Sequence, residues 1–309
     1  MFSKARFMAY LAIAFLSIGL NACGGGSGKA TGEIQVGVTD APVDYAEAVV
    51  IHFTEATLHG PNGNNTIEVF NPVTGDPGRS IDLLQLQGGM WTGLFDDVVA
   101  AGHYSWIRLT LDLSQSYIQI NGQQYALRCT SCENNGYRLN RSFNVEADGT
   151  MALMLDFDLR KSITDPSSGA DYILRPTVRV VETAASGEIT GEIDPNLIAN
   201  LGGFSGCSVY AFDGNDAQLD DIYIPVNMPI PAEQNNPVSS AKVLFENNIY
   251  HYMLSFLPAG NYTLALTCDA DMDSAATDDI LTFSDPINVS VVAGEISNGD
   301  MSLPVVLAN

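Results

Sequence analysis

A run of aspartates near the C-terminal end has the spacing of a ligand-binding loop. The five members are Asp269, Asp271, Asp273, Asp278 and Asp279. Alternating carboxylates supply the hard oxygen ligands that calcium prefers, so the spacing predicts a calcium site. The loop is not an EF-hand, because Ser274 stands where that loop has glycine and Ile280 where it has glutamate. The alternative is a solvated acidic loop that binds nothing.

Asp156 and Asp158 form a second candidate site. They lie two residues apart in a strand-like run, so both carboxylates point to one side of the strand. Like charges at this spacing repel unless a cation or a basic side chain neutralises them. Three interpretations are open. The pair forms a cation site completed by Asp40 or Asp82, or it pairs with a basic residue, or it serves a hydrolase. The candidate basic partners are Arg160, Lys161, Arg108 and Arg175.

Other catalytic signatures are absent from the sequence. The four histidines are scattered without metal-binding spacing, and neither a phosphate-binding loop nor a dinucleotide fingerprint occurs. Two tryptophans could stack on a sugar; Trp91, beside glycines, is expected to be exposed, and Trp106, in a strand run, is expected in the core. Enzymatic activity is therefore not expected.

Four cysteines lie in the body of the chain. Cys129 and Cys132 are three residues apart before a turn signal, and we expect a local disulfide there. Cys207 and Cys268 lie in two strand-like segments and are expected to pair, because an exported chain meets an oxidising compartment. A zinc site at Cys129 and Cys132 would need two further ligands nearby, and none stands out.

The charge of the chain is strongly negative and uneven. The 309 residues carry 13 basic and 36 acidic side chains, for a formal net charge of −23. After Ser186, Lys242 is the one basic residue against 17 acidic ones. Nucleic acid is excluded as a partner, because phosphate binding needs a basic surface.

The hydrophobic pattern predicts an all-β fold. Ile34, Val36 and Val38 alternate with smaller or polar residues, and comparable runs recur between clusters of glycine, proline and asparagine. Many short strands with such turns are typical of β-sandwiches. We expect two sandwich domains, residues 31–184 and 187–309.

Two short echoes suggest that the domains are related. Gly32-Glu33-Ile34 opens the first domain, and Gly187-Glu188-Ile189 opens the second. Later in each domain an Ala-Gly-X-Tyr segment leads into a strand, at residues 101–104 and 259–262. The echoes are short, so a true repeat is only suggested.

The N-terminus indicates export. Lys4 and Arg6 precede an uncharged apolar run, which is too short to span a bilayer comfortably. The run ends in Leu20-Asn21-Ala22-Cys23, which resembles the lipobox of bacterial lipoproteins. The resemblance implies a signal peptide over residues 1–22, lipidation at Cys23 and attachment to a membrane, with residues 23–30 as a glycine-rich tether. Gly24 after the cysteine implies the outer membrane, with the leaflet left open.

Several segments of the first domain resemble one family. They include Val38 to Asp44, Ile81 to Leu86, Leu155 to Ser162 and Leu174 to Pro176. In this order they resemble a domain of unknown function found in bacterial surface lipoproteins. In the second domain, the run from Leu254 to Leu266 resembles a strand–turn–strand of transthyretin-like and carboxypeptidase-regulatory-like sandwiches.

Together these features predict a lipid-anchored protein of the cell envelope. The leading function is a non-catalytic binding or adhesion module, with calcium as the one cofactor considered and a glycan or an envelope protein as its partner. The alternatives are an envelope hydrolase built on Asp156 and Asp158, and a structural spacer within an envelope assembly.

Overall fold

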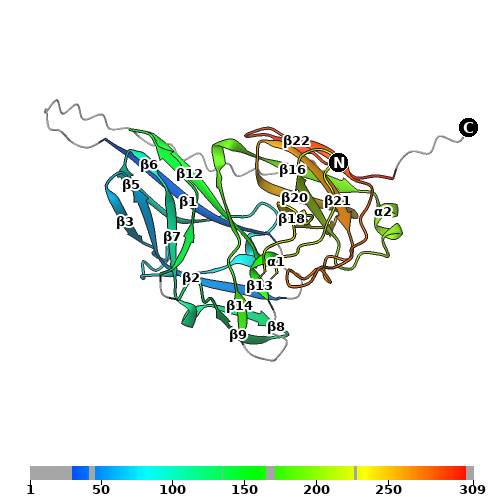
Figure 1. Cartoon of the computed structure of the whole chain (residues 1–309), viewed down its shortest axis with the longest axis horizontal. Coiled ribbons are helices and arrows are strands. Elements are labelled where there is room, and N and C mark those ends of the chain that lie inside the picture. The colour runs from blue at the N-terminus through cyan, green and yellow to red at the C-terminus, as the bar shows by residue number, and fades with distance from the viewer. Residues whose placement is uncertain (1–29, 42–45, 134, 165–170, 226–227, 304–309) are drawn as a thin grey trace, which may run out of the picture.

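A computed structural model describes residues 30–41, 46–133, 135–164, 171–225 and 228–303. The fold is all-β, as the sequence predicts (Figure 1). The signal peptide, Cys23 and all of the tether except Ala30 lie outside the described residues. Below, the first half means residues 30–185 and the second half means residues 186–303.

The first half packs a four-stranded sheet against a larger one. The four-stranded sheet has the order β15-β12-β1-β5, and the nine-stranded sheet has the path β10-β7-β2-β8-β9-β14-β13, with β3 and β4 also paired to β2. A third sheet joins β11 and β6. The strands are β1 (Thr31–Ala41), β2 (Ala48–Gly60), β3 (Gly63–Glu68), β4 (Arg79–Asp82), β5 (Thr92–Ala100), β6 (Gly102–Tyr104), β7 (Trp106–Leu111), β8 (Tyr117–Ile120), β9 (Gln123–Arg128), β10 (Tyr137–Leu139), β11 (Phe143–Val145), β12 (Thr150–Asp158), β13 (Ile163–Thr164), β14 (Tyr172–Leu174) and β15 (Val178–Glu182).

The second half is a sandwich of two four-stranded sheets. Their orders are β19-β20-β16-β23 and β18-β17-β21-β22. The strands are β16 (Ser186–Ile193), β17 (Ser208–Asp213), β18 (Ser239–Lys242), β19 (Leu244–Glu246), β20 (Ile249–Pro258), β21 (Gly260–Thr267), β22 (Ile287–Val291) and β23 (Ile296–Asn298). β20 and β21 are consecutive yet lie in different sheets, so the segment from Leu254 to Leu266 bridges the sandwich.

Helices are few and short. They are η1 (Leu83–Leu86), η2 (Leu113–Gln115), α1 (Leu159–Ser162), η3 (Thr183–Ala185) and α2 (Pro195–Asn200). Among the described residues, no helix has the length and apolar character needed to cross a bilayer.

Strand alternation builds separate cores. In β1, Ile34, Val36 and Val38 point into the cluster of the first half, where Phe53 and Phe157 meet edge to face with ring centroids 6.0 Å apart. A second cluster fills the sandwich of the second half, and a smaller third one lies around Tyr210 and Phe212. Buried apolar area drives such packing, and each of these clusters draws its members from one half.

Both expected disulfides are present. Cys129 pairs with Cys132 within a turn, and Cys207 pairs with Cys268 across 61 residues of chain. The second bridge ties the start of β17 to the end of β21, two strands that are also hydrogen-bonded to each other.

The two halves share one three-strand unit. β1 pairs antiparallel with β5 and parallel with β12, and β16 pairs in the same senses with β20 and β23. The N–H of Ala101 donates to Ala30 O, and that of Ala259 donates to Ala185 O, each acceptor lying two residues before the first glycine of the echo. The sequence echoes therefore mark equivalent positions of a repeated structure.

Candidate ligand-binding groove

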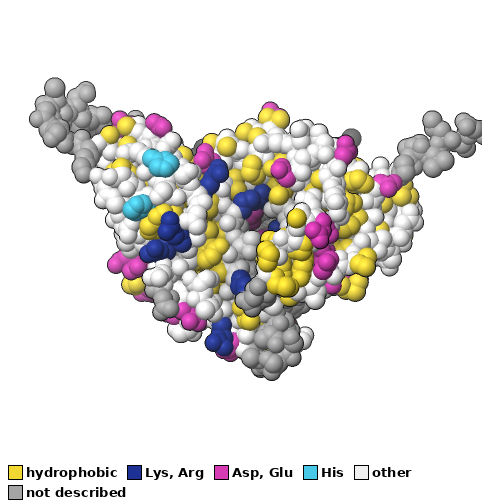
Figure 2. All heavy atoms as spheres, viewed as in Figure 1, with side chains coloured by type: hydrophobic (Ala, Val, Ile, Leu, Met, Phe, Trp, Pro, Cys, Tyr) yellow, Lys and Arg dark blue, Asp and Glu magenta, His cyan; other side chains and the backbone are white. Residues whose placement is uncertain are grey.

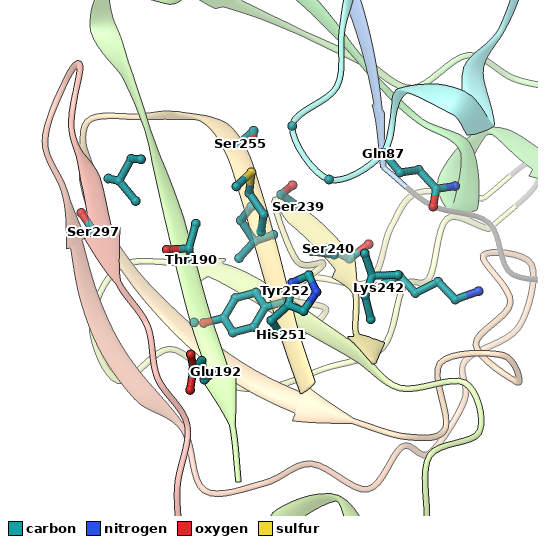
Figure 3. Close-up of a pocket in the computed structure, with 18 of the residues that line it drawn as sticks. Gln87, Thr190, Glu192, Ser239, Ser240, Lys242, His251, Tyr252, Ser255 and Ser297 are labelled. Carbon is teal, nitrogen blue, oxygen red and sulfur yellow. The ribbon is translucent and has the colours of Figure 1, made fainter. Parts of the chain in front are cut away.

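A groove of about 1200 Å³ lies between the two halves. The first half contributes the end of β1, Asp156 of β12 and the loop after η1. The second half contributes mainly β16, β18 and β20, with residues of β19 and β23 at the margins. Figure 3 shows side chains from these three strands, with Gln87 on the side formed by the first half.

The floor of the groove is the outer face of a sheet in the second half. Tyr252 and Leu254 of β20 point into the core, so the alternate residues of that strand face outward. On the outer face the register places Glu192 opposite His251 and Thr190 opposite Met253. Strand alternation thus places both polar and apolar side chains on the groove floor (Figure 3).

The loop after η1 partly roofs this floor. Gly89 has a φ of +81°, and a Cβ added to it would stand 2.6 Å from Met253 Sδ and 2.8 Å from Ser255 Oγ. The Thr39 hydroxyl lies 2.8 Å from Met90 O and 3.2 Å from Leu86 O, and so ties the loop to β1. The positive φ favours glycine at this point, where the loop passes close to side chains of β20.

Unsatisfied buried polar atoms gather beneath the surface of the groove. Five buried side-chain atoms of the described chain lack a hydrogen-bond partner, and four of them belong to residues that line it: both carboxylate oxygens of Asp40, Ser240 Oγ and Ser255 Oγ. The fifth is Arg108 Nε, outside the groove. Buried polar groups are nearly always paired in folded proteins, so a concentration of unpaired ones needs an explanation.

Asp40 is the most perturbed of these groups. Burial is the main cause that raises its pKa well above the ordinary value, and the carboxylates of Asp156, Asp158 and Asp82 raise it further. The backbone N–H of Leu159 acts in the opposite direction, but no hydrogen bond of normal geometry reaches either oxygen from the described residues. The burial and the three neighbouring carboxylates outweigh that one amide.

The structure brings the four predicted acids Asp40, Asp82, Asp156 and Asp158 into one region, where three of them have protein partners. Asp156 accepts two hydrogen bonds from the Arg179 guanidinium. Asp158 lies 2.8 Å from Lys161 Nζ and accepts from the backbone N–H of Lys161 at 3.1 Å, which caps α1. Lys161 is among the partners expected from sequence; Arg179, 23 residues away, is not.

Asp82 has a capping role. Its Oδ1 atom accepts from the N–H of Leu84 at 3.2 Å, within η1, and from that of Val49 at 3.0 Å. The side chain thereby satisfies two backbone donors, as N-terminal caps do. Of the four acids, Asp40 alone lacks a partner in the described part of the chain.

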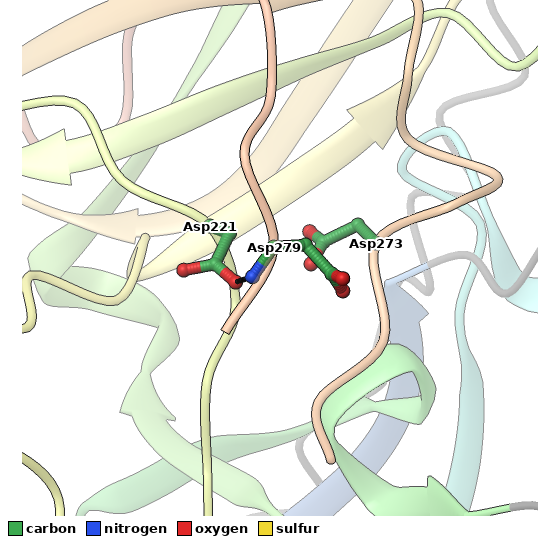
Figure 4. A group of neighbouring side chains, drawn as sticks. All are labelled: Asp221, Asp273 and Asp279. Atoms are coloured by element: carbon green, nitrogen blue, oxygen red, sulfur yellow. Dashed lines mark hydrogen bonds between the residues drawn. The ribbon is translucent and has the colours of Figure 1, made fainter. Parts of the chain in front are cut away.

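The predicted calcium loop is only partly assembled. Asp273 and Asp279 come together with Asp221, each offering a carboxylate oxygen within 4.8 Å of the others (Figure 4). Asp271 and Asp278 are exposed, and Asp269 accepts from the backbone N–H of Thr282 at 2.8 Å. The third member of the cluster is therefore a residue that the loop pattern does not include.

The clustered acids already accept hydrogen bonds. Asp221 accepts from the backbone N–H of Asp279, and Asp273 accepts from the Tyr210 hydroxyl and, at 3.2 Å, from the N–H of Ile222. Burial, the largest cause, raises the pKa of Asp273 to about 6, and it also raises the pKa of Asp221. Carboxylates of this kind suit a hard cation, although calcium takes six to eight oxygens and the rest would have to come from carbonyls or water.

A buried arginine links this cluster to the first half. Arg160, on α1, is 5% exposed and donates to the hydroxyl of Tyr210, which in turn donates to Asp273. Next to it, Lys161 Nζ donates to Pro237 O at 2.6 Å. Figure 1 shows α1 between the two halves. These two basic residues of the first half thus dock onto the second.

The two tryptophans lie in different environments. Trp91 is 57% exposed. Trp106 is buried, stacks on His59 with ring centroids 5.0 Å apart, and has the guanidinium carbons of Arg108 and Arg138 each 4.8 Å from its ring centre. Neither ring lines the groove.

Basic side chains are concentrated on one side of the molecule. Figure 2 shows Lys and Arg over the left and centre of the visible face and acidic side chains on both sides. This agrees with the single basic residue after Ser186. The second half therefore presents a negative surface.

One family model matches part of the chain. Residues 31–176 match the family described as "Domain of unknown function (DUF4382)". No curated protein matches the chain. The matched segment coincides with most of the domain whose family resemblance the sequence indicates.

Solved structures match only weakly. The Bacillus anthracis TIE protein is 13% identical with a TM-score of 0.20; the match covers 88% of this chain and 34% of that one, so this chain spans about a third of its length. GBS52, the minor pilin of Streptococcus agalactiae, is 8% identical over 89% and 98% of the two chains, with a TM-score of 0.20. The fimbrial anchor protein Mfa2 of Porphyromonas gingivalis is 12% identical over 80% and 82%, with a TM-score of 0.17. Scores this low carry no argument about fold or function.

Proposed function

We propose that this protein is a non-catalytic binding module of the bacterial cell envelope, and that it takes its ligand in the groove between its halves. The observation that carries the proposal is the groove itself, which has a volume of about 1200 Å³ and is lined by residues of both halves, among them Gln87, Thr190 and His251. Glycans and envelope proteins both offer suitable donors and acceptors.

The partners of Asp156 and Asp158 favour binding over hydrolysis. A carboxylate that acts as general acid, base or nucleophile must reach the substrate. Asp156 is held by Arg179, and Asp158 by Lys161 and the start of α1. Breaking either buried pair would leave an uncompensated charge, which costs about 3–5 kcal/mol. The two residues are thus suited to stabilise the fold.

We propose the domain division and the anchor on separate grounds. The separate cores and the repeated unit support two domains that meet near residue 185. Attachment through Cys23 rests on the lipobox resemblance. The expected result is that Cys23→Ser moves the protein from the membrane fraction to the soluble fraction of the expressing cells. Retention of Cys23→Ser in the membrane would contradict the anchor.

The binding proposal is tested by blocking the groove. The chain from Lys29 onward, without the anchor cysteine, is titrated by NMR with a panel of envelope glycans and short peptides. Thr190→Trp places a bulky ring on the groove floor, and Gln124→Trp places the same ring on exposed β9. Binding should be lost in Thr190→Trp and kept in Gln124→Trp, with the ligand recovered unchanged by mass spectrometry. Chemical conversion of the ligand, or binding that survives Thr190→Trp, would overturn the proposal.

A further inference from the structure

We infer that the outer face of β7 and β10 binds a phosphate group carried on a neutral saccharide, through the guanidinium groups of Arg108 and Arg138. The inference concerns the first half and does not rest on the proposed function, because neither arginine lines the groove. It follows from three features of the described residues: the stacking of both arginines on Trp106, their lack of acidic partners and the exposure of their N–H groups.

Strand alternation places the two arginines side by side. Leu109 of β7 and Leu139 of β10 point into the core of the first half, so Arg108 and Arg138 face outward. The register puts these two arginines directly opposite each other. Both guanidinium carbons lie 4.8 Å from the ring centre of Trp106, so they are no more than twice that distance apart. Figure 2 shows basic side chains gathered on the left of the visible face, where Figure 1 has β7.

Neither arginine has an acidic partner within the described part of the chain. The sequence carries 36 acidic residues against 13 basic ones, yet no ion pair or hydrogen bond from the described residues reaches the guanidinium group of Arg108 or Arg138. Two like charges directly opposite each other destabilise a sheet. Stacking on the Trp106 ring offsets part of this repulsion but leaves both charges in place. A bound anion would neutralise them.

The N–H donors of both groups are open to a ligand at the surface. Arg138 is exposed and Arg108 is half-buried. Within the Arg108 guanidinium, Nε is buried, whereas the terminal Nη1 and Nη2 atoms, which also lack partners among the described residues, are accessible. A guanidinium whose face lies on an aromatic ring keeps its edge free, and that edge carries the paired donors that match an oxyanion.

Two adjacent positive charges match a phosphate group better than a carboxylate. A phosphate ester carries a charge of about −1.5 to −2 at neutral pH and has three strong acceptor oxygens. A carboxylate has a single charge and two oxygens. Because each guanidinium group can donate two parallel hydrogen bonds, the three oxygens of a phosphate accommodate both groups more readily.

The carrier of the phosphate should be close to neutral. The chain has a net charge of −23, which repels an extended anionic surface such as an acidic membrane or a nucleic acid. A single charged group on a neutral carrier avoids this repulsion. Beside Trp106 the register continues with His59 of β2 and Asn64 of β3, both exposed. Their side chains can pair with hydroxyl groups, which favours a saccharide as the carrier.

The experiment uses Trp106 as the reporter of its own site. The sequence has two tryptophans, so Trp91→Phe in the chain from Lys29 onward leaves the fluorescence of Trp106 alone. Glucose 6-phosphate should change this emission saturably and glucose should not, because only the phosphate pairs with the guanidinium groups. Glucuronate, which carries a carboxylate, should bind more weakly than glucose 6-phosphate.

Matched arginine variants assign the effect. Arg138→Gln should lower the affinity for glucose 6-phosphate by at least about tenfold, through loss of a charge-assisted pair, and should leave the thermal midpoint unchanged. Arg138→Lys keeps the charge without the planar fork and should fall between. Arg128→Gln makes the same change of net charge at an exposed position of β9, in the same half, and should bind like the parent.

Three outcomes would overturn the inference. They are the absence of a saturable change with glucose 6-phosphate, equal binding of glucose, and binding that survives Arg138→Gln. Tighter binding of a blocked phosphoserine tripeptide, or of phosphatidylcholine vesicles that contain phosphatidic acid, would overturn the saccharide carrier. The groove-blocking test is independent of all these results, because Arg138 lies outside the groove.

Discussion

Asp273 shows how burial decides what an acidic residue does. From the sequence it is one of five aspartates in a loop, with nothing to separate it from its neighbours. In the fold it is buried, and it meets Asp221, which lies 52 residues earlier in the chain. A spacing pattern describes neighbours along one segment, so it could indicate acidic ligands but not which of them turn inward, nor their distant partner.

The pKa of Asp273 predicts a pH dependence of stability. The pKa is about 6 in the folded chain, against 3.8 for an unperturbed aspartate, so the folded state binds the proton more tightly. This stabilisation is complete below about pH 4 and is lost as the pH rises through 6. At 1.36 kcal/mol per pKa unit, the loss is about 3 kcal/mol. Urea unfolding between pH 4 and pH 8 measures it.

The Asp273→Asn variant isolates this contribution. Asp40, Asp156 and Asp221 are shifted in the same direction, so the whole chain loses more stability than Asp273 explains. Asp273→Asn should reduce the loss between pH 4 and pH 8 by about 3 kcal/mol, whereas the exposed Asp285→Asn should leave it unchanged. An unchanged loss in Asp273→Asn would show that its carboxyl is not perturbed.

Calcium binding remains a prediction, now placed at Asp221, Asp273 and Asp279. A cation held by these carboxylates would favour their ionised forms and stabilise the folded chain at neutral pH. Calcium added after a chelator should stabilise the folded chain by about 2.7 kcal/mol at a hundred times Kd, and the thermal midpoint should rise with calcium concentration. The rise should vanish in Asp221→Asn and persist in the exposed Asp271→Asn. Absence of any rise would leave the cluster as a hydrogen-bonded anchor for the surrounding loops.

At the scale of elements, the repeated unit was partly visible in the sequence. The echoes at residues 32–34 and 187–189, and at 101–104 and 259–262, occupy equivalent positions in the two halves. The strands that complete the units, β12 and β23, share no comparable motif, because backbone pairing sets few demands on side-chain identity. Fold class could therefore be predicted from alternation, whereas the parallel pairings could not.

Local sequence was least informative where a strand run breaks or changes sheet. The apolar residues from Tyr172 to Val181 are divided between β14 and β15, which are separated by residues 175–177. Pro176 lies in this gap, and proline has no N–H to donate to a ladder. β20 and β21 read as neighbours but belong to opposite sheets, a choice set by long-range packing.

The tyrosines of the two Ala-Gly-X-Tyr echoes, Tyr104 and Tyr262, should contribute equally to the free energy of unfolding. Tyr104 OH donates to Ala100 O at 2.8 Å, and Tyr262 OH donates to Pro258 O at 2.7 Å, each to the residue four positions earlier. Tyr104→Phe and Tyr262→Phe should each cost about 1 kcal/mol in urea unfolding, the net value of one hydrogen bond. Tyr117→Phe, whose hydroxyl has no partner among the described residues, should cost nothing measurable. Unequal costs for Tyr104 and Tyr262 would show that the two corners are not equivalent.

At the scale of the whole molecule, the groove could not be predicted because each half contributes one side of it. Asp40 belongs to a strand of the first half, and Ser240 and Ser255 to strands of the second. The same holds for the Asp156-to-Lys161 segment, which suggests a cation site when read alone. In the fold its acids hold Arg179 and cap α1, and its basic residues Arg160 and Lys161 dock onto the second half. The segment from Asp156 to Lys161 therefore forms a joint, meaning a set of contacts that hold the two halves together.

Arg160 therefore carries a prediction about the whole chain. Arg160→Met keeps much of the side-chain volume but leaves Tyr210 and Asp273 buried without their cationic partner. Loss of one member of a buried charged network costs about 3–5 kcal/mol. Because this contact joins the halves, calorimetry should show one thermal transition in the parent chain and two in Arg160→Met. Arg128→Met, at an exposed position of β9, should behave like the parent. A single transition at an unchanged midpoint in Arg160→Met would mean that the halves are held together by other contacts, and that the groove keeps its shape without this joint.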